Sequence, residues 1–272
     1  MSIGKSILLN LAAVAGLAAV VASASVPAWA AEEDTWPSLR SELFGAKPIA
    51  DAGALLTLEA PIRAEDAALV PVTIRFPAGT AEVRKLTLIV EKNPAPMAAA
   101  FTFGPASATA ERIIETRLRF DMYSNLRAVA EMADGSLVMS TRFVKAAGGC
   151  SAPALKDADE ALALIGRTLI KDVAALPGSD PGRIGQVMVR HPNYSGMQMN
   201  QLTGLYIPAK YVTNMSVTRG ADSIFELEAG ISLSEDPNIR FNYIAKSGEP
   251  LTVTTTDSDG RTFKGSSIPS GS

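Results

Sequence analysis

The sequence predicts an all-β protein with two β-sandwich domains, joined by a linker that contains one amphipathic helix. Short runs of β-branched and apolar residues recur at roughly ten-residue spacing, which is typical of β-sandwiches. Turn signals rich in glycine, proline, aspartate and asparagine separate these runs. In the middle of the chain, residues 151–180 instead combine helical spacing with Pro-Gly breaks.

Residues 1–30 have the features of a cleavable signal peptide. A lone positive charge precedes an apolar run, Ile7 to Val21, and Ala28-Trp29-Ala30 fits a small-x-small cleavage site before Ala31. The apolar run is shorter than the ~20 residues that a membrane-spanning helix needs. We therefore expect a periplasmic protein that has no membrane partner.

The composition excludes several function classes. The chain has 272 residues, a formal net charge of −3, one cysteine and one histidine. This charge balance argues against a nucleic-acid partner, which would require clustered lysine and arginine. A single cysteine excludes an internal disulfide, and a single histidine excludes a histidine-rich metal site. Because phosphate-loop, dinucleotide and nucleophile-elbow motifs are also missing, we predict no metal, no cofactor and no enzymatic activity.

The first sandwich is predicted over residues 36–150. Its strands are expected at Leu69–Phe76, Val83–Glu91, Ile114–Met122, Ala128–Met132 and Leu137–Val144. In the third of these runs apolar and charged residues alternate with a period of two, which indicates a half-buried strand. Asp134-Gly135 is a strong hairpin signal. The last strand leads directly to Gly148-Gly149-Cys150.

The linker is predicted over residues 151–180 and the second sandwich over residues 181–268. The apolar residues of the linker recur at helical spacing: Leu162, Ile165, Leu169 and Val173. The strands of the second sandwich are expected at Ile184–Val189, Tyr211–Arg219, Ser223–Ala229, Ile239–Ile244, Leu251–Thr256 and Arg261–Lys264.

The most informative residue is Cys150. In an oxidising compartment its thiol has no partner within its own fold. Two glycines before it and small residues after it provide little bulk to pack around a sulfur atom. We therefore expect an exposed thiol on a flexible arm, with Gly148, Gly149 and Ser151 as the hinge.

Several interpretations of Cys150 are open on the residues alone. Free cysteine is often buried, so it could be a small core residue. It could form a disulfide between two copies of the chain. It could carry a covalent adduct between partner enzymes, which requires a narrow stem and a thiol that ionises. A cysteine hydrolase would place His191 beside the thiol, although a lone histidine at a strand end is more often a structural hydrogen-bonding residue.

Motifs along both halves resemble a known pair of families. The first half contains Glu91-Lys92-Asn93-Pro94-Ala95-Pro96, Ala100-Phe101, Leu58-Glu59-Ala60-Pro61, Val70-Pro71-Val72 and Gly148-Gly149-Cys150, and it resembles SoxY, the sulfur-substrate carrier of periplasmic sulfur oxidation. The second half contains Arg190-His191-Pro192, Ser195-Gly196-Met197, Tyr206-Ile207-Pro208-Ala209, Asp236-Pro237-Asn238 and Asp257 to Gly260, and it resembles the partner subunit SoxZ. The chain is thus similar to a natural SoxY–SoxZ fusion.

This resemblance implies two immunoglobulin-like sandwiches that pair within the chain. It implies that Cys150 covalently holds sulfur intermediates, as in thiosulfate oxidation, while separate enzymes load, oxidise and hydrolyse them. The partners that it implies are c-type cytochromes and other sulfur-oxidising enzymes. The SoxZ-like half would be a packing partner with no catalytic residue.

The chain departs from the SoxY pattern after the cysteine. Ser151 stands where the family has glycine, and the chain continues instead of ending. A two-ended loop cannot thread a narrow tunnel, so docking would need a wider cleft or other partners. Similar fused chains are associated with quinoprotein alcohol dehydrogenases. The alternative prediction is therefore an accessory or scaffold protein of a periplasmic quinoprotein dehydrogenase, with Cys150 incidental or dimerising.

Overall fold

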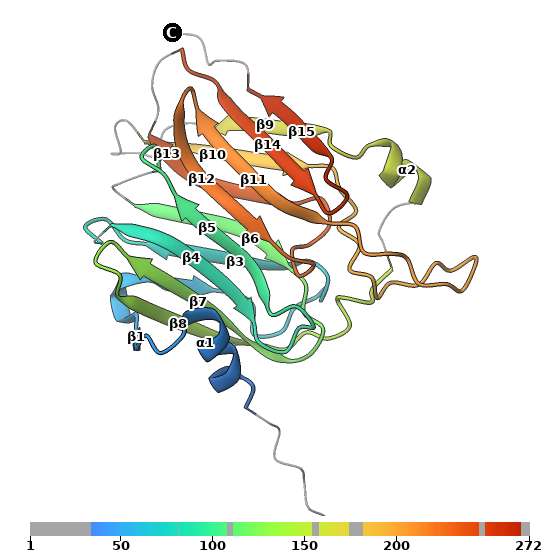
Figure 1. The fold of residues 1–272 in the computed structure, drawn as a ribbon, viewed down its shortest axis with the longest axis horizontal. Coiled ribbons are helices and arrows are strands. Elements are labelled where there is room, and N and C mark those ends of the chain that lie inside the picture. The colour runs from blue at the N-terminus through green and yellow to red at the C-terminus, as the bar shows by residue number, and fades with distance from the viewer. Residues whose placement is uncertain are drawn as a thin grey trace, which may run out of the picture. The chain divides into compact units, whose positions relative to one another are not determined.

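The computed structural model describes residues 34–80, 82–107, 111–153, 158–173, 182–244 and 248–267 (Figure 1). The predicted signal peptide lies outside these residues. Within the described ranges, no helix has the length and hydropathy needed to cross a bilayer. The chain from Thr35 onward forms one compact unit.

Two β-sheets make up most of this unit, and the predicted all-β class is confirmed. One sheet has nine strands in the spatial order β1 (Ile49–Asp51), β8 (Leu137–Val144), β7 (Ser124–Met132), β4 (Val83–Val90), β5 (Met97–Phe103), β12 (Asp222–Ala229), β11 (Val212–Arg219), β14 (Leu251–Asp257) and β15 (Thr262–Ser266). The other has six, in the order β2 (Thr57–Glu59), β3 (Val70–Phe76), β6 (Arg112–Leu118), β13 (Asn238–Ile244), β10 (Gly182–Val189) and β9 (Thr168–Val173). The helices are α1 (Trp36–Phe44), the 3-10 turn η1 (Gly53–Leu55) and α2 (Ala158–Ala163).

Both sheets run without a break from the first half of the chain into the second. In the nine-stranded sheet β5 pairs with β12 antiparallel, and Phe101 lies opposite Leu227. In the six-stranded sheet β6 pairs with β13, and Ile114 lies opposite Phe241. Figure 1 shows the green strands of the first half beside the orange strands of the second in each layer. The two sandwiches therefore join edge to edge, and the halves pair within the chain.

Aromatic side chains fill the space between the sheets where the halves meet. The ring centroids of Phe101 and Phe225 are 5.5 Å apart, and those of Phe225 and Phe241 are 5.1 Å apart, both in edge-to-face geometry. Gly185 leaves room for this stack, because a Cβ there would lie 2.6 Å from the Phe241 ring. Buried residues from both halves belong to one hydrophobic cluster. The fold thus has a core that neither half completes alone.

The linker prediction is wrong in part. Helix α2 ends at Ala163, and Leu169 and Val173 belong to strand β9 instead of extending the helix. Strand β9 pairs with β10 along its length, and Leu169 lies opposite Met188. The backbone of the segment 168–173 gains a full ladder of hydrogen bonds at this sheet edge, which a short isolated helix cannot match.

Helix α1, over Trp36–Phe44, was not predicted from the sequence. Helix α1 lies on the nine-stranded sheet, where Trp36, Leu43 and Phe44 pack against the cluster Ile89, Val129 and Leu137. The Trp36 ring also stacks on the guanidinium of Arg127, at 4.2 Å. Trp36 can therefore serve as a fluorescent probe of the packing of the first half.

Candidate functional site

The segment that carries Cys150 folds back against the end of the first half. The N–H of Gly148 donates to the carbonyl of Asp121 at 2.9 Å, and the N–H of Gly149 donates to the carbonyl of Phe120 at 2.8 Å. Strand β8 thus delivers the cysteine to the residues that follow strand β6. We call residues 148–151 the docked segment.

Cys150 is fully buried, with a relative exposure of 0%, so the prediction of an exposed thiol is wrong for this conformation. The second half closes over it, because the Ser195 hydroxyl donates to the carbonyl of Cys150. The cysteine therefore lies where the two halves meet. The small neighbours that suggested exposure instead allow close backbone packing.

The predicted hinge residues have different roles in this conformation. Gly148 has a φ of +80° and open space around its Cα, so it makes the turn. Gly149 is tightly enclosed, since a Cβ there would lie 2.1 Å from the Ala67 carbonyl oxygen. Ser151 is exposed, and its N–H and hydroxyl both donate to the Gly148 carbonyl, each at 3.3 Å. The docked segment is a closed turn, and whether it opens as a hinge stays a prediction.

Burial keeps the Cys150 thiol protonated. Desolvation and, to a smaller extent, the charge of Asp121 raise its pKa from an ordinary value of 9.0 to about 12, and Arg119 acts in the opposite direction without outweighing them. Because the thiolate is the nucleophile, the docked thiol is unreactive at neutral pH. Chemistry at this sulfur requires the segment to open.

The free energy of unfolding is expected to fall as the pH rises above about 9. An unfolded chain loses the thiol proton near the ordinary pKa of 9.0, whereas the folded chain keeps it to about 12. Between these values the unfolded state binds fewer protons, so stability decreases with pH. Urea titrations of the wild type and of Cys150→Ser between about pH 8 and pH 11 measure this, and the variant should lack this part of the decrease. Identical pH profiles would contradict a buried neutral thiol.

Asn93 fixes the residues on which the segment docks. Its side-chain amide donates to the Arg119 carbonyl at 2.7 Å and to the Ser232 hydroxyl at 2.9 Å. Its side-chain oxygen accepts from the N–H of Asp121 at 2.8 Å. Asn93 belongs to the run Glu91 to Pro96 that carries the resemblance to SoxY, so that motif builds the floor of the cysteine site.

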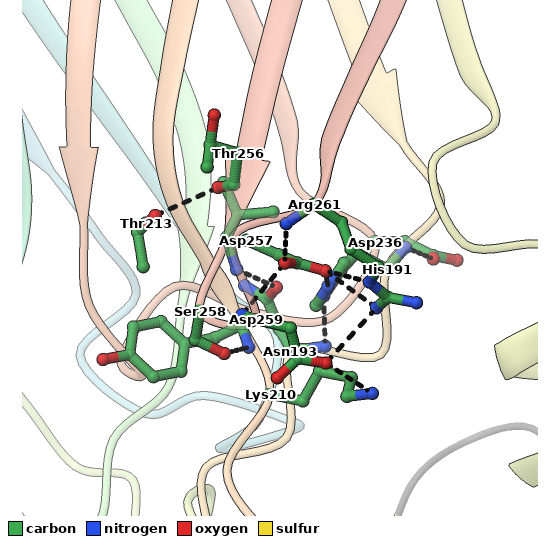
Figure 2. A network of polar contacts seen from close by, with 12 residues as sticks. His191, Asn193, Lys210, Thr213, Asp236, Thr256, Asp257, Ser258, Asp259 and Arg261 are labelled. Atoms are coloured by element: carbon green, nitrogen blue, oxygen red, sulfur yellow. Dashed lines mark hydrogen bonds and ion pairs between the residues drawn. The ribbon is translucent and has the colours of Figure 1, made fainter.

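The single histidine belongs to a buried polar network in the second half (Figure 2). Nδ1 of His191 accepts from the N–H of Asn193 at 3.1 Å, and Nε2 lies 3.6 Å from Oδ2 of Asp257. Burial lowers the pKa of His191, with Asp257 opposing, and the neutral ring is the form that accepts at Nδ1. Arg261 donates to Asp257 at 2.9 Å from Nε. His191 therefore has the structural role, and it supports Asn193, a non-glycine residue with a φ of 45°.

The loop after Ser195 leaves the body of the protein and exposes apolar side chains. Figure 1 shows it as the long orange loop before β11. Its exposed residues are Met199, Leu202, Leu205 and Tyr206, and Leu202 is 96% exposed. The residue that contacts the Cys150 carbonyl is thus continuous in sequence with an exposed apolar surface.

Two family models match the chain, one on each half. The model described as "Sulfur oxidation protein SoxY" matches residues 40–150, and the model described as "Sulphur oxidation protein SoxZ" matches residues 180–267. The chain therefore belongs to the SoxY and SoxZ families and joins both domains in one polypeptide. The SoxY match ends at Cys150.

Among solved structures, the chain is similar to the sulfur carrier protein SoxY from Chlorobium limicola f thiosulfatophilum. It is 27% identical, the match covers 41% of this chain and 90% of that one, and the TM-score is 0.33. A superoxide reductase (neelaredoxin) from Ignicoccus hospitalis is 18% identical over 34% of this chain and 79% of its own, with a TM-score of 0.28. At these TM-scores the likenesses add nothing to the family assignment. No protein with a curated description matches the chain.

Proposed function

We propose that this chain is a periplasmic carrier protein that covalently holds sulfur-containing intermediates on Cys150 for partner enzymes and is not itself an enzyme. The observation that carries the proposal is the position of the only cysteine, at the last residue of the SoxY match and beneath the SoxZ half. The periplasmic location rests on the signal-peptide features of residues 1–30.

A buried cysteine suits a carrier between transfers. In the docked position the sulfur is separated from water and from other thiols, which would otherwise hydrolyse or exchange an adduct. The segment is attached by the hydrogen bonds of Gly148, Gly149 and Ser195, each worth about 0.5–1.5 kcal/mol net. Opening it therefore costs a few kcal/mol at most, well below the cost of unfolding a domain.

The chemistry of loading identifies the class of partner. Joining the Cys150 thiolate to the outer sulfur of thiosulfate forms one S–S bond and releases two electrons. The part of the chain that the structure describes contains no group that could accept these electrons. The electrons therefore pass to an oxidising partner such as a c-type cytochrome. An enzyme that later hydrolyses the terminal sulfonate would release sulfate and leave a sulfur on the cysteine.

Intact-mass spectrometry of the protein purified from its own periplasm without reductant tests the proposal. We expect an added sulfur-containing mass on the peptide with Cys150, removed by reductant and missing in Cys150→Ser. Ser151→Ala is the matched control and should keep the adduct, because its side chain is exposed. An unmodified thiol while the pathway is running would contradict the carrier role.

The complete burial of Cys150 favours a second candidate, an accessory protein of a periplasmic quinoprotein dehydrogenase in which the thiol has no chemical role. This candidate predicts that co-purification with the dehydrogenase survives Cys150→Ser and that no adduct forms. A dimer linked through Cys150 would require the docked segment to open first, and a non-reducing gel would detect it.

A further inference from the structure

Arg119 is the largest side chain that is fully buried, at 1% relative exposure, and it lies just after strand β6. Its guanidinium donates only to backbone carbonyls: to Asn193 at 2.5 Å, Leu233 at 3.0 Å, Ile231 at 3.4 Å and Pro192 at 3.5 Å. Its Nε–H has no hydrogen-bond partner. Among the hydrogen bonds between described residues none joins this cation to a carboxylate, although Glu235 and Asp66 act on it through their charge.

A buried cation without an anion is expensive. Carbonyl dipoles compensate part of the desolvation cost, but burial of a full charge normally requires a counter-charge. Arginine stays protonated under these conditions, so it cannot avoid the cost by losing its charge. This arrangement leaves an incompletely compensated positive charge and a free donor inside the protein.

The free donor and the docked thiol belong to the same closed site. The two residues after Arg119 accept the hydrogen bonds of Gly148 and Gly149. On the other side, Asn193 accepts from Arg119, and Ser195, two residues further on, donates to the carbonyl of Cys150. The same two segments therefore enclose both groups. Burial lowers the pKa of Arg119, and the groups that oppose this effect are an ionised Cys150, which has the largest influence, and then Glu235 and Asp66.

The unmodified thiol does not supply a directly bonded anion, because burial keeps it protonated at neutral pH. An oxidised sulfur group on Cys150 would supply it. A sulfonate has three acceptor oxygens, and one of them could accept from the free Nε–H of Arg119.

We propose that Arg119 binds the anionic end of the group carried on Cys150, a sulfonate or a related sulfur oxyanion, so that the docked site favours charged cargo over neutral cargo. The inference rests on the proposed carrier function and specifies the charge of its cargo. The carbonyls that bind Arg119 all belong to the second half, so Arg119 also joins the halves. A test must separate these two roles.

Two chemical adducts of the full mature chain provide that test. The Cys150 thiolate attacks a central sulfur of tetrathionate, which forms a sulfenyl thiosulfate with a terminal sulfonate and releases thiosulfate. Methyl methanethiosulfonate instead transfers a neutral methylthio group and releases methanesulfinate. Both reactions are run slowly at mildly alkaline pH, and intact mass confirms one adduct on the only cysteine. Thermal unfolding midpoints are then compared.

In the wild type we expect the anionic adduct to unfold at the same temperature as the neutral adduct or higher. In Arg119→Met the order should reverse, with the anionic adduct lower by roughly 4 °C or more. Arg117→Met is the matched control two residues earlier, on β6, since Arg117 donates to the Asp236 carbonyl and is only half-buried. It should keep the wild-type order.

An equal difference between the two adducts in the wild type and in Arg119→Met would overturn the proposal. If Arg119→Met does not fold, the two adducts of the wild type still test the proposal. An anionic adduct with an unfolding midpoint well below that of the neutral adduct would contradict the proposal that Arg119 provides its counter-charge. The adducts are made chemically, without partner enzymes. A negative result of the adduct experiment therefore does not contradict the carrier function. An unmodified thiol in the protein purified from its periplasm would, in turn, not contradict the binding of an anionic adduct by Arg119.

Discussion

Gly149→Ala is expected to expel the docked segment and expose the Cys150 thiol. A Cβ on Gly149 would lie 2.1 Å from the Ala67 carbonyl oxygen and 2.8 Å from that of Phe120. Both contacts are with backbone, which cannot rotate away, and overpacking of this kind costs about 1–3 kcal/mol. That cost is comparable to the free energy of the hydrogen bonds that hold the docked segment. We therefore expect the variant to relieve the clash by opening this segment instead of straining the rest of the fold. The reaction rate with an aromatic disulfide reagent at neutral pH should rise at least about tenfold.

Gly148→Asn is the control for this experiment. Gly148 has a φ of +80° with no atom within 4 Å of a Cβ, and asparagine tolerates a left-handed backbone better than other residues. Its thiol should react close to the wild-type rate. Equal rates in the two variants would contradict the tight packing of Gly149.

Phe225→Ala is expected to destabilise both halves of the chain together. Phe225 is fully buried between Phe101 of the first half and Phe241 of the second. Removing such a ring costs about 3–5 kcal/mol, since it leaves a cavity as well as losing apolar burial. We therefore expect one unfolding transition in both proteins, shifted to lower denaturant concentration in the variant.

Trp36 makes this measurement specific. It packs on the first half, whereas Phe225 lies in the second, and the only other tryptophan is Trp29 in the predicted signal peptide. Fluorescence of Trp36 and far-UV circular dichroism should give the same midpoint in each protein. Phe263→Ala, at the outer strand β15, is the matched control with a smaller expected loss. A Trp36 midpoint that Phe225→Ala leaves unchanged would show that the halves unfold separately.

The strands with strong local patterns could be predicted from the sequence. The alternation through Ile114, Thr116 and Leu118 gave the right face of β6, and Asp134-Gly135 gave the β7–β8 hairpin, where Gly135 has a φ of +82°. Strand β5 was missed because its run Met97–Phe103 is rich in alanine, which has low strand propensity. Its small side chains pack between larger strands on both sides, and only the tertiary contacts select that conformation.

The site was harder to predict for a related reason. By alternation Arg119 belongs on the solvent face beside Arg117, and it is buried only because the second half covers that face. The small residues around Cys150 fit an exposed arm and a tightly packed turn equally well. The role of Cys150 stays a prediction, and the choice between these conformations depends on Ser195, which is 45 residues away in sequence.

The edge-to-edge pairing has a consequence for how the protein behaves at low abundance. If the halves were separate chains, β5, β6, β12 and β13 would each be an unpaired edge at low concentration, open to pairing with any other strand. On one polypeptide the local concentration of the partner edge is set by the linker and does not fall on dilution. These four edges are therefore covered at any expression level, and aggregation through them is suppressed without a second gene product.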